Sequence, residues 1–563
     1  MSFNALLLQS VAIELKKSLL GARVDKVYQP DKSTVILELR LPGENLHLLL
    51  SAHPQLGRIH LTGIRPAGPP TPSSFCMLLR KHLEKHRLDD ITAVPFERVV
   101  HLHFSRDEDY GRTKARKTLV LEIMGKHSNL IVLDEDGVVV DALFRIDESK
   151  SRVRQILPKI PYSLPPAQKK KSPHDLTLQE LSWFLEVAGP DRWSEALVKN
   201  IRGISPDVAR QIITGAGGLA ASPEKIHGII GQLVELSEEG RLVPRIESES
   251  LVFYPPGSGQ INTVLDSYYT RMSEQDKLLQ QKSSLLTVVR GHLNRSTKKL
   301  SARNEALENA QKKEEYRRKG DLLTASLHLI KKGMSLVEVP DYYAEGQPLV
   351  AIELDPSLTP NQNAQNYYKR YNKARSALEN LDRLLEETEN EIAYLENLSG
   401  LIEAAKDLAD VESLKEELKS EGYLKEKETV KTNKKSRGSL DAPRRYLTPS
   451  GNEIVVGRNN KQNDTIRRQA SGEFWWFHTQ KVPGSHVVLR SAEPLPEDFE
   501  TAAMLAAVFS KASTDSVVFV DSARVKRVRK PQGAKPGFVT YDNEKTYTVK
   551  PDESVLFKLK ELK

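Results

Sequence analysis

The sequence predicts a multidomain α+β protein in which a long antiparallel coiled coil lies between two α+β domains. The chain has 563 residues, too many for one hydrophobic core. Strand-like and helix-like segments mix near both ends, whereas leucine recurs every seven residues in the middle. We expect five segments: 1–168, an α+β domain; 174–255, a helix-hairpin-helix domain; 262–424, a coiled coil with a small β tip; 425–445, a basic linker; and 446–555, a second α+β domain.

The N-terminal domain is expected to combine two helices with several strands. Apolar residues at helical spacing predict a helix over 5–19, and a second helix is expected over 73–87. Alternating or continuous apolar runs predict strands over 34–40, 46–51, 98–104, 117–124, 129–134 and 137–142. Strands packed with helices in this way make an α+β domain.

The next segment contains Val198–Asp207, which has the pattern of a helix-hairpin-helix. Gly203 supplies the turn, Ser205 is the expected N-cap, and Pro206 occupies the first helical position. The exposed N–H groups of such a helix start can bind phosphate. A purely structural hairpin has the same pattern, so both interpretations stay open.

The middle segment shows the clearest periodicity in the chain. A coiled-coil helix is predicted by Met272, Leu279, Leu286, Leu293, Leu300 and Leu307. A second helix is expected over 361–420, after a short β-hairpin over 334–354. Because the first arm is basic near its tip and the second is acidic, the two arms can pair within one chain. We therefore expect a monomer when the protein is free.

Composition points to a soluble protein with a polyanionic partner. The formal net charge of +8 and the sequence pI near 9.1 favour nucleic acid. The single cysteine, Cys76, excludes an intramolecular disulfide framework and is expected in a core. The N-terminus lacks a signal-peptide pattern, and charged residues interrupt every apolar stretch, so we expect a cytoplasmic protein without a membrane partner.

The last domain carries motifs rich in glycine, asparagine and basic residues: 456–464, 473–478, 483–490 and 528–537. Glycine allows the backbone to approach phosphate closely, and arginine and lysine neutralise it. The candidate RNA- or ribosome-binding residues are Arg458, Asn459, Lys461, Asn463, His478, His486, Arg529, Lys530 and Lys535. The two histidines lack a third ligand at plausible spacing, so we expect no metal and no cofactor.

These motifs resemble the RNA-binding NFACT-R domain. The N-terminal strings 1–4, 24–30, 75–83, 122–129 and 151–155 are similar to the NFACT-N domain, whose fold is like that of Fpg-type DNA glycosylases. With the helix-hairpin-helix and the coiled coil, the resemblance to the NFACT family, of the bacterial RqcH type, covers essentially the whole chain.

The resemblance implies a factor for ribosome quality control. Such a factor binds a large ribosomal subunit obstructed by peptidyl-tRNA, contacts rRNA, and recruits alanyl-tRNA. The ribosome then adds a C-terminal alanine tail without mRNA, and the tail marks the nascent chain for degradation. The chemistry belongs to the ribosome, so we expect no enzyme active site in this chain.

The same resemblance implies a tRNA-binding site in the N-terminal domain. An Asp-Arg pair of the family corresponds to Glu97 and Arg98, and a second functional strip corresponds to Glu122, Ile123 and Met124. Glutamate keeps the acidic charge on a side chain that is one methylene longer. Without the resemblance, Glu97 and Arg98 would be a surface ion pair at a strand start.

Three alternatives remain open at this stage. A factor could bind the ribosome or tRNA without tailing activity, which the change to Glu97 leaves possible. The family is also named for fibronectin binding, so a moonlighting surface adhesin is a second alternative. A DNA glycosylase is the enzyme alternative, but this chain has Ser2-Phe3 in place of the N-terminal proline nucleophile and lacks zinc-finger cysteines.

Overall fold

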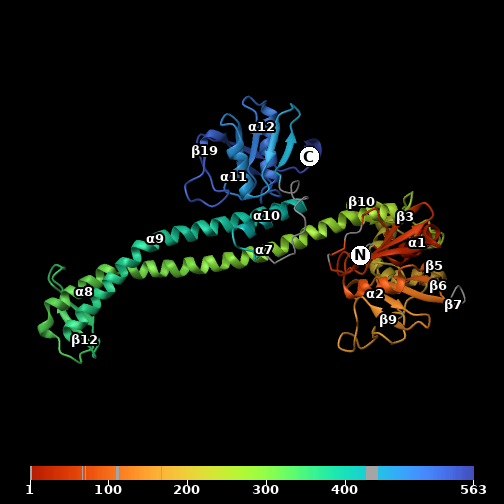
Figure 1. The fold of residues 1–563 in the computed structure, drawn as a ribbon, viewed down its shortest axis with the longest axis horizontal. Coiled ribbons are helices and arrows are strands. Elements are labelled where there is room, and N and C mark those ends of the chain that lie inside the picture. The colour runs from red at the N-terminus through yellow and green to blue at the C-terminus, as the bar shows by residue number, and fades with distance from the viewer. Residues whose placement is uncertain are drawn as a thin grey trace. The chain divides into compact units, whose positions relative to one another are not determined.

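The computed structural model describes residues 3–65, 68–69, 71–108, 113–166, 168–425 and 442–562 (Figure 1). Met1–Gln275 and Asp276–Lys563 form two compact units. Most of the expected basic linker, residues 426–441, lies outside the described residues, as does Ser2, on which the glycosylase alternative depends.

The first unit is built on a nine-stranded antiparallel sheet in the order β4-β3-β2-β1-β5-β6-β7-β8-β9. Its strands are β1 (Arg23–Tyr28), β2 (Thr34–Leu41), β3 (Glu44–Ser51), β4 (Arg58–Leu61), β5 (Arg87–Ala93), β6 (Val99–Glu108), β7 (Thr113–Glu122), β8 (Asn129–Leu133) and β9 (Val139–Ala142). The predictions found β2, β3 and β6 to β9 but missed β1, β4 and β5. These three strands are short or rich in charged residues, so alternation does not mark them.

Two helices pack on this sheet and share its main core. Helix α1 (Ala5–Leu19) matches its predicted range, and Asn4 caps it by accepting a hydrogen bond from the Leu7 N–H at 2.9 Å. Helix α2 (Ser74–Leu83) ends earlier than predicted because the chain turns at Lys85, whose φ is 70°, into β5. Cys76 is buried in this core, as expected.

Four helices follow within the first unit: α3 (Leu178–Ala188), α4 (Trp193–Asn200), α5 (Pro206–Gly215) and α6 (Pro223–Glu238). Helices α4 and α5 form the predicted helix-hairpin-helix, with Ser205 as the N-cap of α5. Helix α7 (Ile261–Gln311) then begins against α1. The Glu14 carboxylate accepts hydrogen bonds from the N–H groups of Ile261 at 2.9 Å and Asn262 at 3.0 Å.

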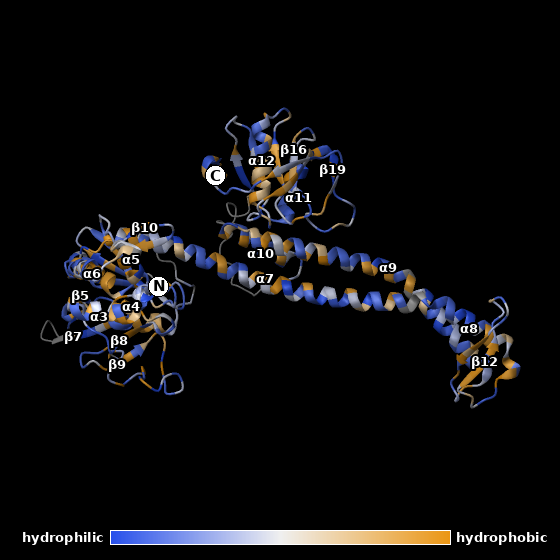
Figure 2. Ribbon diagram, turned by 180° about the vertical axis from the view of Figure 1, so that it is seen from behind, coloured by the Kyte–Doolittle hydropathy of each residue, from blue (hydrophilic) through white to orange (hydrophobic). Residues whose placement is uncertain are grey.

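The second unit contains the coiled coil. Helix α9 (Pro360–Ala404) packs against α8 (Lys313–Ala325), and Arg303 of α7 donates to the Thr388 hydroxyl of α9. The tip carries a β-hairpin of β12 (Leu336–Pro340) and β13 (Leu349–Glu353), where Figure 2 shows hydrophobic residues on β12. No helix within the described residues is both long and apolar enough to span a bilayer.

Three details of the coiled coil correct the predictions. The second helix breaks at 405–407, and α10 (Leu408–Ser420) starts anew with Asp407 as its N-cap. Leu279 is 64% exposed, whereas Leu286 and Leu293 of the predicted row pack against the core that contains the buried Leu285 and Val289. The basic tip residues pair locally rather than across the arms, as Lys319 does with Glu315 at 2.6 Å.

The C-terminal domain has a seven-stranded antiparallel sheet in the order β21-β18-β16-β17-β15-β14-β22. Its strands are β14 (Arg444–Leu447), β15 (Glu453–Val456), β16 (Trp475–Thr479), β17 (Val487–Arg490), β18 (Val518–Arg524), β21 (Lys545–Val549) and β22 (Lys560–Glu561). Helix α12 (Pro496–Val508) joins the core on one face, and α11 (Asn460–Gln469) joins a separate core that contains Trp476. Strands β19 (Val528–Arg529) and β20 (Thr540–Tyr541) form a small hairpin.

Candidate nucleic-acid interface

The two strips that sequence reasoning assigned to tRNA lie side by side in the first unit. Glu97 and Arg98 form the turn that enters β6, where the Glu97 N–H donates to the Val94 carbonyl at 3.0 Å. The Ile123 N–H donates to the Arg98 carbonyl at 2.9 Å, and Val99 pairs with Glu122 across β6 and β7. Antiparallel pairing therefore unites residues that are distant in the sequence.

The members of these strips differ in burial. Glu97, Arg98 and Met124 are partly exposed, whereas Glu122 and Ile123 are completely buried. Partial burial lowers the pKa of the Arg98 guanidinium from its ordinary value. Glu122 and Ile123 thus support the site from within the domain, and direct tRNA contact by their side chains does not fit this burial. The three exposed side chains keep their predicted role.

Glu122 is held by a buried polar cluster. Its two carboxylate oxygens accept hydrogen bonds from both Arg154 terminal nitrogens, at 2.8 and 2.6 Å, and from the Tyr162 hydroxyl at 2.7 Å. Burial, followed by the nearby Glu122 charge, raises the pKa of Tyr162. Bidentate pairing fixes both partners in one geometry. Glu122 therefore joins the end of β7 to the segment around Arg154, which sequence reasoning had noted only as part of a family string.

The helix-hairpin-helix packs directly on the Glu97 turn. Gly203 has a φ of +80°, and a Cβ there would lie 3.2 Å from the Cβ of Phe96. Phe96 itself has a φ of 58°, and its ring meets His174 at 5.1 Å between centroids. Lys171, at the end of the basic run, donates its N–H to the Asn200 carbonyl at 2.8 Å. The turn, the hairpin and the basic run therefore meet at one place.

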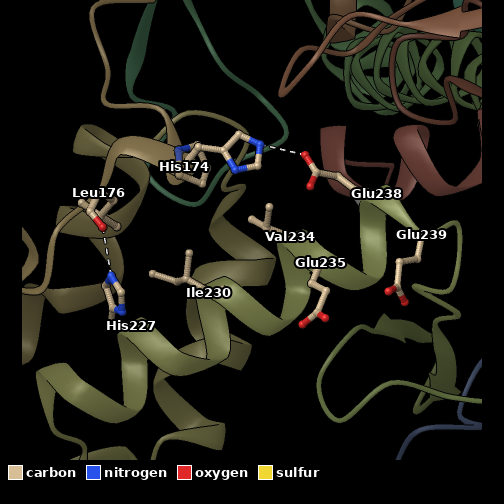
Figure 3. A pocket seen from close by; sticks show the side chains of 10 residues that line it. His174, Leu176, His227, Ile230, Val234, Glu235, Glu238 and Glu239 are labelled. Atoms are coloured by element: carbon tan, nitrogen blue, oxygen red, sulfur yellow. Dashed lines mark hydrogen bonds and ion pairs between the residues drawn. The ribbon is translucent and has the colours of Figure 1, made fainter.

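A hollow of about 520 Å³ lies next to this meeting point, along α6 (Figure 3). His174 points toward Glu238, with 2.7 Å between Nε2 and Oε1, and His227 faces the Leu176 carbonyl at 2.9 Å. Glu235 and Glu239 add further negative charge to the lining. Carboxylates repel phosphate, so this hollow is not the part of the surface that would hold an RNA backbone.

In the second unit, several candidate residues are internal. Arg458 places Nη1 at 2.7 Å from Asp410 and 3.1 Å from Asp407, and its side chain is 12% exposed. The Asn459 amide donates to the Ser413 hydroxyl at 2.7 Å, and the Asn463 side-chain oxygen accepts from the His486 N–H at 3.1 Å. These side chains hold the C-terminal domain together and against α10, so direct RNA contact by them does not fit their burial.

Asp407, Asp410, Arg444 and Arg458 together form what we call the α10 joint. Arg444 places Nη2 at 2.5 Å from Asp410 and 2.8 Å from Asp407, and both Arg444 and Asp410 have side chains that are 4% exposed. The arginine charges lower the pKa of Asp407 despite its partial burial. The joint therefore fixes the C-terminal domain to the base of the coiled coil through ion pairs in which Arg444, Asp410 and Arg458 are largely buried.

Three of the basic candidates, Lys461, Arg529 and Lys535, keep the more exposed positions, and Lys530 is partly exposed. Lys461 is 43% exposed and lies 3.1 Å from Glu421, and Lys535 is 39% exposed and lies 3.6 Å from the same carboxylate. Lys530 pairs with Asp464 at 2.5 Å, and Arg529 is exposed. These side chains can reach phosphate, and their contact with RNA stays a prediction.

His478 and His486 lie together, with 5.2 Å between their ring centroids. Burial lowers the pKa of His478 to about 4 and that of His486 well below its ordinary value, so both rings are neutral near pH 7. Neutral rings do not offset the charge of phosphate, so neither histidine can bind phosphate through charge. Within the described residues, no group of His, Cys, Asp and Glu side chains is arranged to hold a metal ion.

Comparison with known proteins finds one family model that matches the N-terminal and middle part of the chain and another that matches its C-terminal part. The family model for the NFACT N-terminal and middle domains matches residues 4–437, and the model for the NFACT protein RNA-binding domain matches 444–536. The chain belongs to the NFACT family. The resemblance inferred from the sequence is thereby confirmed, as is the multidomain α+β fold with its coiled coil.

Curated NFACT relatives match over the whole length. The chain is 35% identical over 574 residues to the Rqc2 homolog RqcH of Bacillus subtilis, covering 100% of both chains. It is 34% identical to the Rqc2 homolog RqcH of Streptococcus suis, again over 100% of both. A solved C-terminal part of the Streptococcus suis fibronectin/fibrinogen-binding protein has 35% identity, covers 50% of this chain and 99% of that one, and gives a TM-score of 0.39.

Sequence reasoning missed three residues of the Glu122 cluster and the α10 joint. Tyr162 and the two aspartates of the α10 joint were not singled out, because an isolated tyrosine or aspartate carries no local signal for a partner far along the chain. Asp407 could have been found as a helix N-cap, since Asp410 follows it by three residues in a capping box. Its pairing with Arg444 and Arg458 depends on tertiary structure alone.

Proposed function

We propose that this protein acts in ribosome quality control by binding a large ribosomal subunit that is obstructed by peptidyl-tRNA. It then recruits alanyl-tRNA, and the ribosome adds a C-terminal alanine tail to the stalled chain without mRNA. Two full-length relatives named as Rqc2 homologs support this role, as does a partial match to a human ribosome quality control complex subunit, NEMF. The NFACT RNA-binding domain supports RNA as a partner.

The convergence in the first unit is the observation that carries the tRNA part of the proposal. Arg98, with an exposed portion of its side chain, lies beside Met124 and next to the helix-hairpin-helix at Gly203. A basic side chain beside a helix-hairpin-helix suits a folded RNA backbone. The chain would bind and select tRNA while the peptidyl-transferase centre performs the chemistry, so this protein would have no catalytic residues and act in the cytoplasm.

The first test is the RNA that accompanies the protein. We expect the tagged protein, purified from its native cells in mild salt, to carry large-subunit rRNA and enriched alanyl-tRNA. Arg98→Ala should lose the tRNA, whereas Arg40→Ala should keep it. Arg40 is a matched control because its side chain is 60% exposed and lies on β2, away from the Glu97 turn.

The outcomes separate the alternatives. Large-subunit rRNA without selected tRNA would contradict alanine tailing and leave a ribosome-binding factor. The absence of ribosomal RNA would contradict the whole proposal. Mass spectrometry of stalled nascent chains then measures the tail directly, and Glu97→Asp should retain tailing because it restores the family's residue with the same charge.

A further inference from the structure

The second unit contains a cavity of about 650 Å³ between α9 and the C-terminal domain. One wall is α9, which contributes Arg383, Ala393 and Asn397. The opposite wall is the C-terminal sheet together with the loop between β19 and β20. Cavities of this size in proteins commonly hold a small ligand or one group of a larger one.

Aromatic rings line the inner wall. Trp476 is completely buried, and its ring lies 4.9 Å from Tyr541, 5.2 Å from His486 and 5.8 Å from His478, between centroids. The Tyr541 hydroxyl donates to Asp521 at 2.8 Å, which fixes that ring. Tyr541 is partly exposed and is backed by the buried Trp476, so it offers a planar face on which a flat, conjugated ligand can stack.

Three of the side chains that line the cavity carry buried polar atoms without partners. The Trp476 Nε1, the His486 Nδ1 and the Asn397 Oδ1 are all buried among residues that line the cavity, and none has a hydrogen-bond partner. Trp476 is 0% and His486 is 2% exposed. A buried polar atom without a partner is costly, so native proteins normally supply one. Here a ligand that carries both donors and acceptors would supply it.

The loop that closes the cavity is held in place. Lys530 pairs with Asp464 at 2.5 Å, and the Gly537 N–H donates to the same carboxylate at 3.3 Å. A side chain at Gly537 would collide with Asn460. Lys535 lies over the Tyr394 ring at 5.5 Å from its centroid. The cavity therefore exists before any ligand arrives, which reduces the entropy lost on binding.

We infer that this cavity takes one unstacked nucleobase of single-stranded RNA. A nucleobase is flat, carries donors and acceptors on its edge, and is followed by a phosphate that Arg383 or Lys535 can neutralise. Glu386 and Glu387 also line the opening and can accept from an exocyclic amino group or a ribose hydroxyl. An aromatic peptide side chain would fill the space but, apart from its backbone, leave most of the polar atoms unpaired. The inference rests on the proposed RNA-binding function and names this cavity as one place where RNA binds.

The test compares a base-bearing oligonucleotide with an abasic one. The probe is a fluorescent single-stranded RNA of about eight nucleotides, within the range bound by single domains. The full-length protein should bind it at least roughly five-fold more tightly than an abasic oligomer of equal length, as one stacked base provides. Ala393→Trp should abolish this difference because Ala393 lines the cavity from an exposed helix position.

Ala306→Trp is the matched control, since Ala306 is also exposed and lies on α7 outside the cavity lining. It should retain the preference for the base-bearing probe. Equal binding of both probes by the unchanged protein would overturn the inference, as would a preference that survives Ala393→Trp. Binding of an aromatic tripeptide instead, blocked by Ala393→Trp, would overturn it in favour of a peptide site.

Copurified large-subunit rRNA separates this inference from the proposed function. If the rRNA is present but the base preference is absent, only the cavity assignment fails. If the rRNA is absent but Ala393→Trp abolishes a base preference, the ribosomal role fails and the cavity assignment stands.

Discussion

At the residue scale, Glu122 shows how a motif found by family resemblance can serve the interior of a domain. Its carboxylate is completely buried and is held by Arg154 and Tyr162. Removing one partner from a buried ion pair leaves an uncompensated charge, which is far more costly than losing a surface pair. Its substitution would therefore affect stability as well as any contact with tRNA.

We expect Arg154→Met to lower the free energy of unfolding of the first unit by about 3–5 kcal/mol. Arg145→Met is the control because Arg145 is 60% exposed and pairs with Asp141 at 2.8 Å, so it should cost under about 1 kcal/mol. Urea unfolding followed by circular dichroism measures both. Similar losses for the two variants would show that the Glu122 cluster is not the structural element we describe.

A second prediction at this scale concerns His60. Burial and the neighbouring Arg58 lower its pKa from 6.5 to about 4, while Asp266 acts in the opposite direction. Between these values the unfolded chain binds a proton that the folded chain does not, so stability should fall as the pH decreases from about 6.5 to 4. Thermal melts across this range should show a shallower decline for His60→Gln than for the exposed control His127→Gln. If the melting temperatures of the two variants changed equally with pH, His60 would not be the source of the pH dependence.

At the scale of elements, the hairpin turn at Gly203 is a tightly constrained position beside the candidate tRNA site. Gly203→Ala combines a left-handed backbone with a Cβ that would lie 3.2 Å from Phe96. We expect it to destabilise the first unit by about 1–3 kcal/mol and to weaken tRNA binding.

Gly21→Ala isolates the backbone contribution. Gly21 has a φ of +79°, nearly the same as Gly203, but nothing lies within 4 Å of its added Cβ. It should lose only about 1 kcal/mol and leave tRNA binding unchanged. Chemical unfolding and tRNA filter binding test the pair, and an unaltered affinity in Gly203→Ala would separate the hairpin from the site.

Elements also show what the sequence could and could not predict. Helical and strand periodicity found α1, β2, β3, the hairpin of β12 and β13, and both arms of the coiled coil, because each has a regular apolar pattern. The pattern failed for β5, whose sequence RLDDITA contains charged residues, and for the break before α10. The strips at Glu97 and Glu122 were found by family resemblance, but their burial depends on strand pairing and on Arg154.

At the scale of the whole molecule, the α10 joint decides whether the C-terminal domain and the coiled-coil base act as one body. Asp410→Ala would leave Arg444 buried without one of its two carboxylates. We expect a loss of about 3–5 kcal/mol in the stability of this attachment. Hydrogen exchange should rise in α10 and β14 while β16, in the centre of the sheet, stays protected.

Glu412→Ala controls for a charge removed from the same helix. Glu412 pairs with Lys415 at 3.0 Å, and both side chains are 41% exposed, so the change should cost under about 1 kcal/mol. Equal exchange in the two variants would mean that the joint does not hold the domain. Increased exchange at β16 in Asp410→Ala would mean that the joint supports the fold of the domain itself.

The α10 joint also determines where the chain can be divided when its RNA-binding domain is exchanged. Its two aspartates precede residues 426–441, and its two arginines follow them, so a cut at the obvious linker divides the charges between two fragments. A chimera that took only the RNA-binding domain from a relative would lose the matched arginines and leave the two aspartates of α10 without their partners. Exchanging α10 together with the domain would avoid this loss. A segment that is exchanged as one unit in this protein should therefore begin at Asp407, well before the boundary that composition suggests.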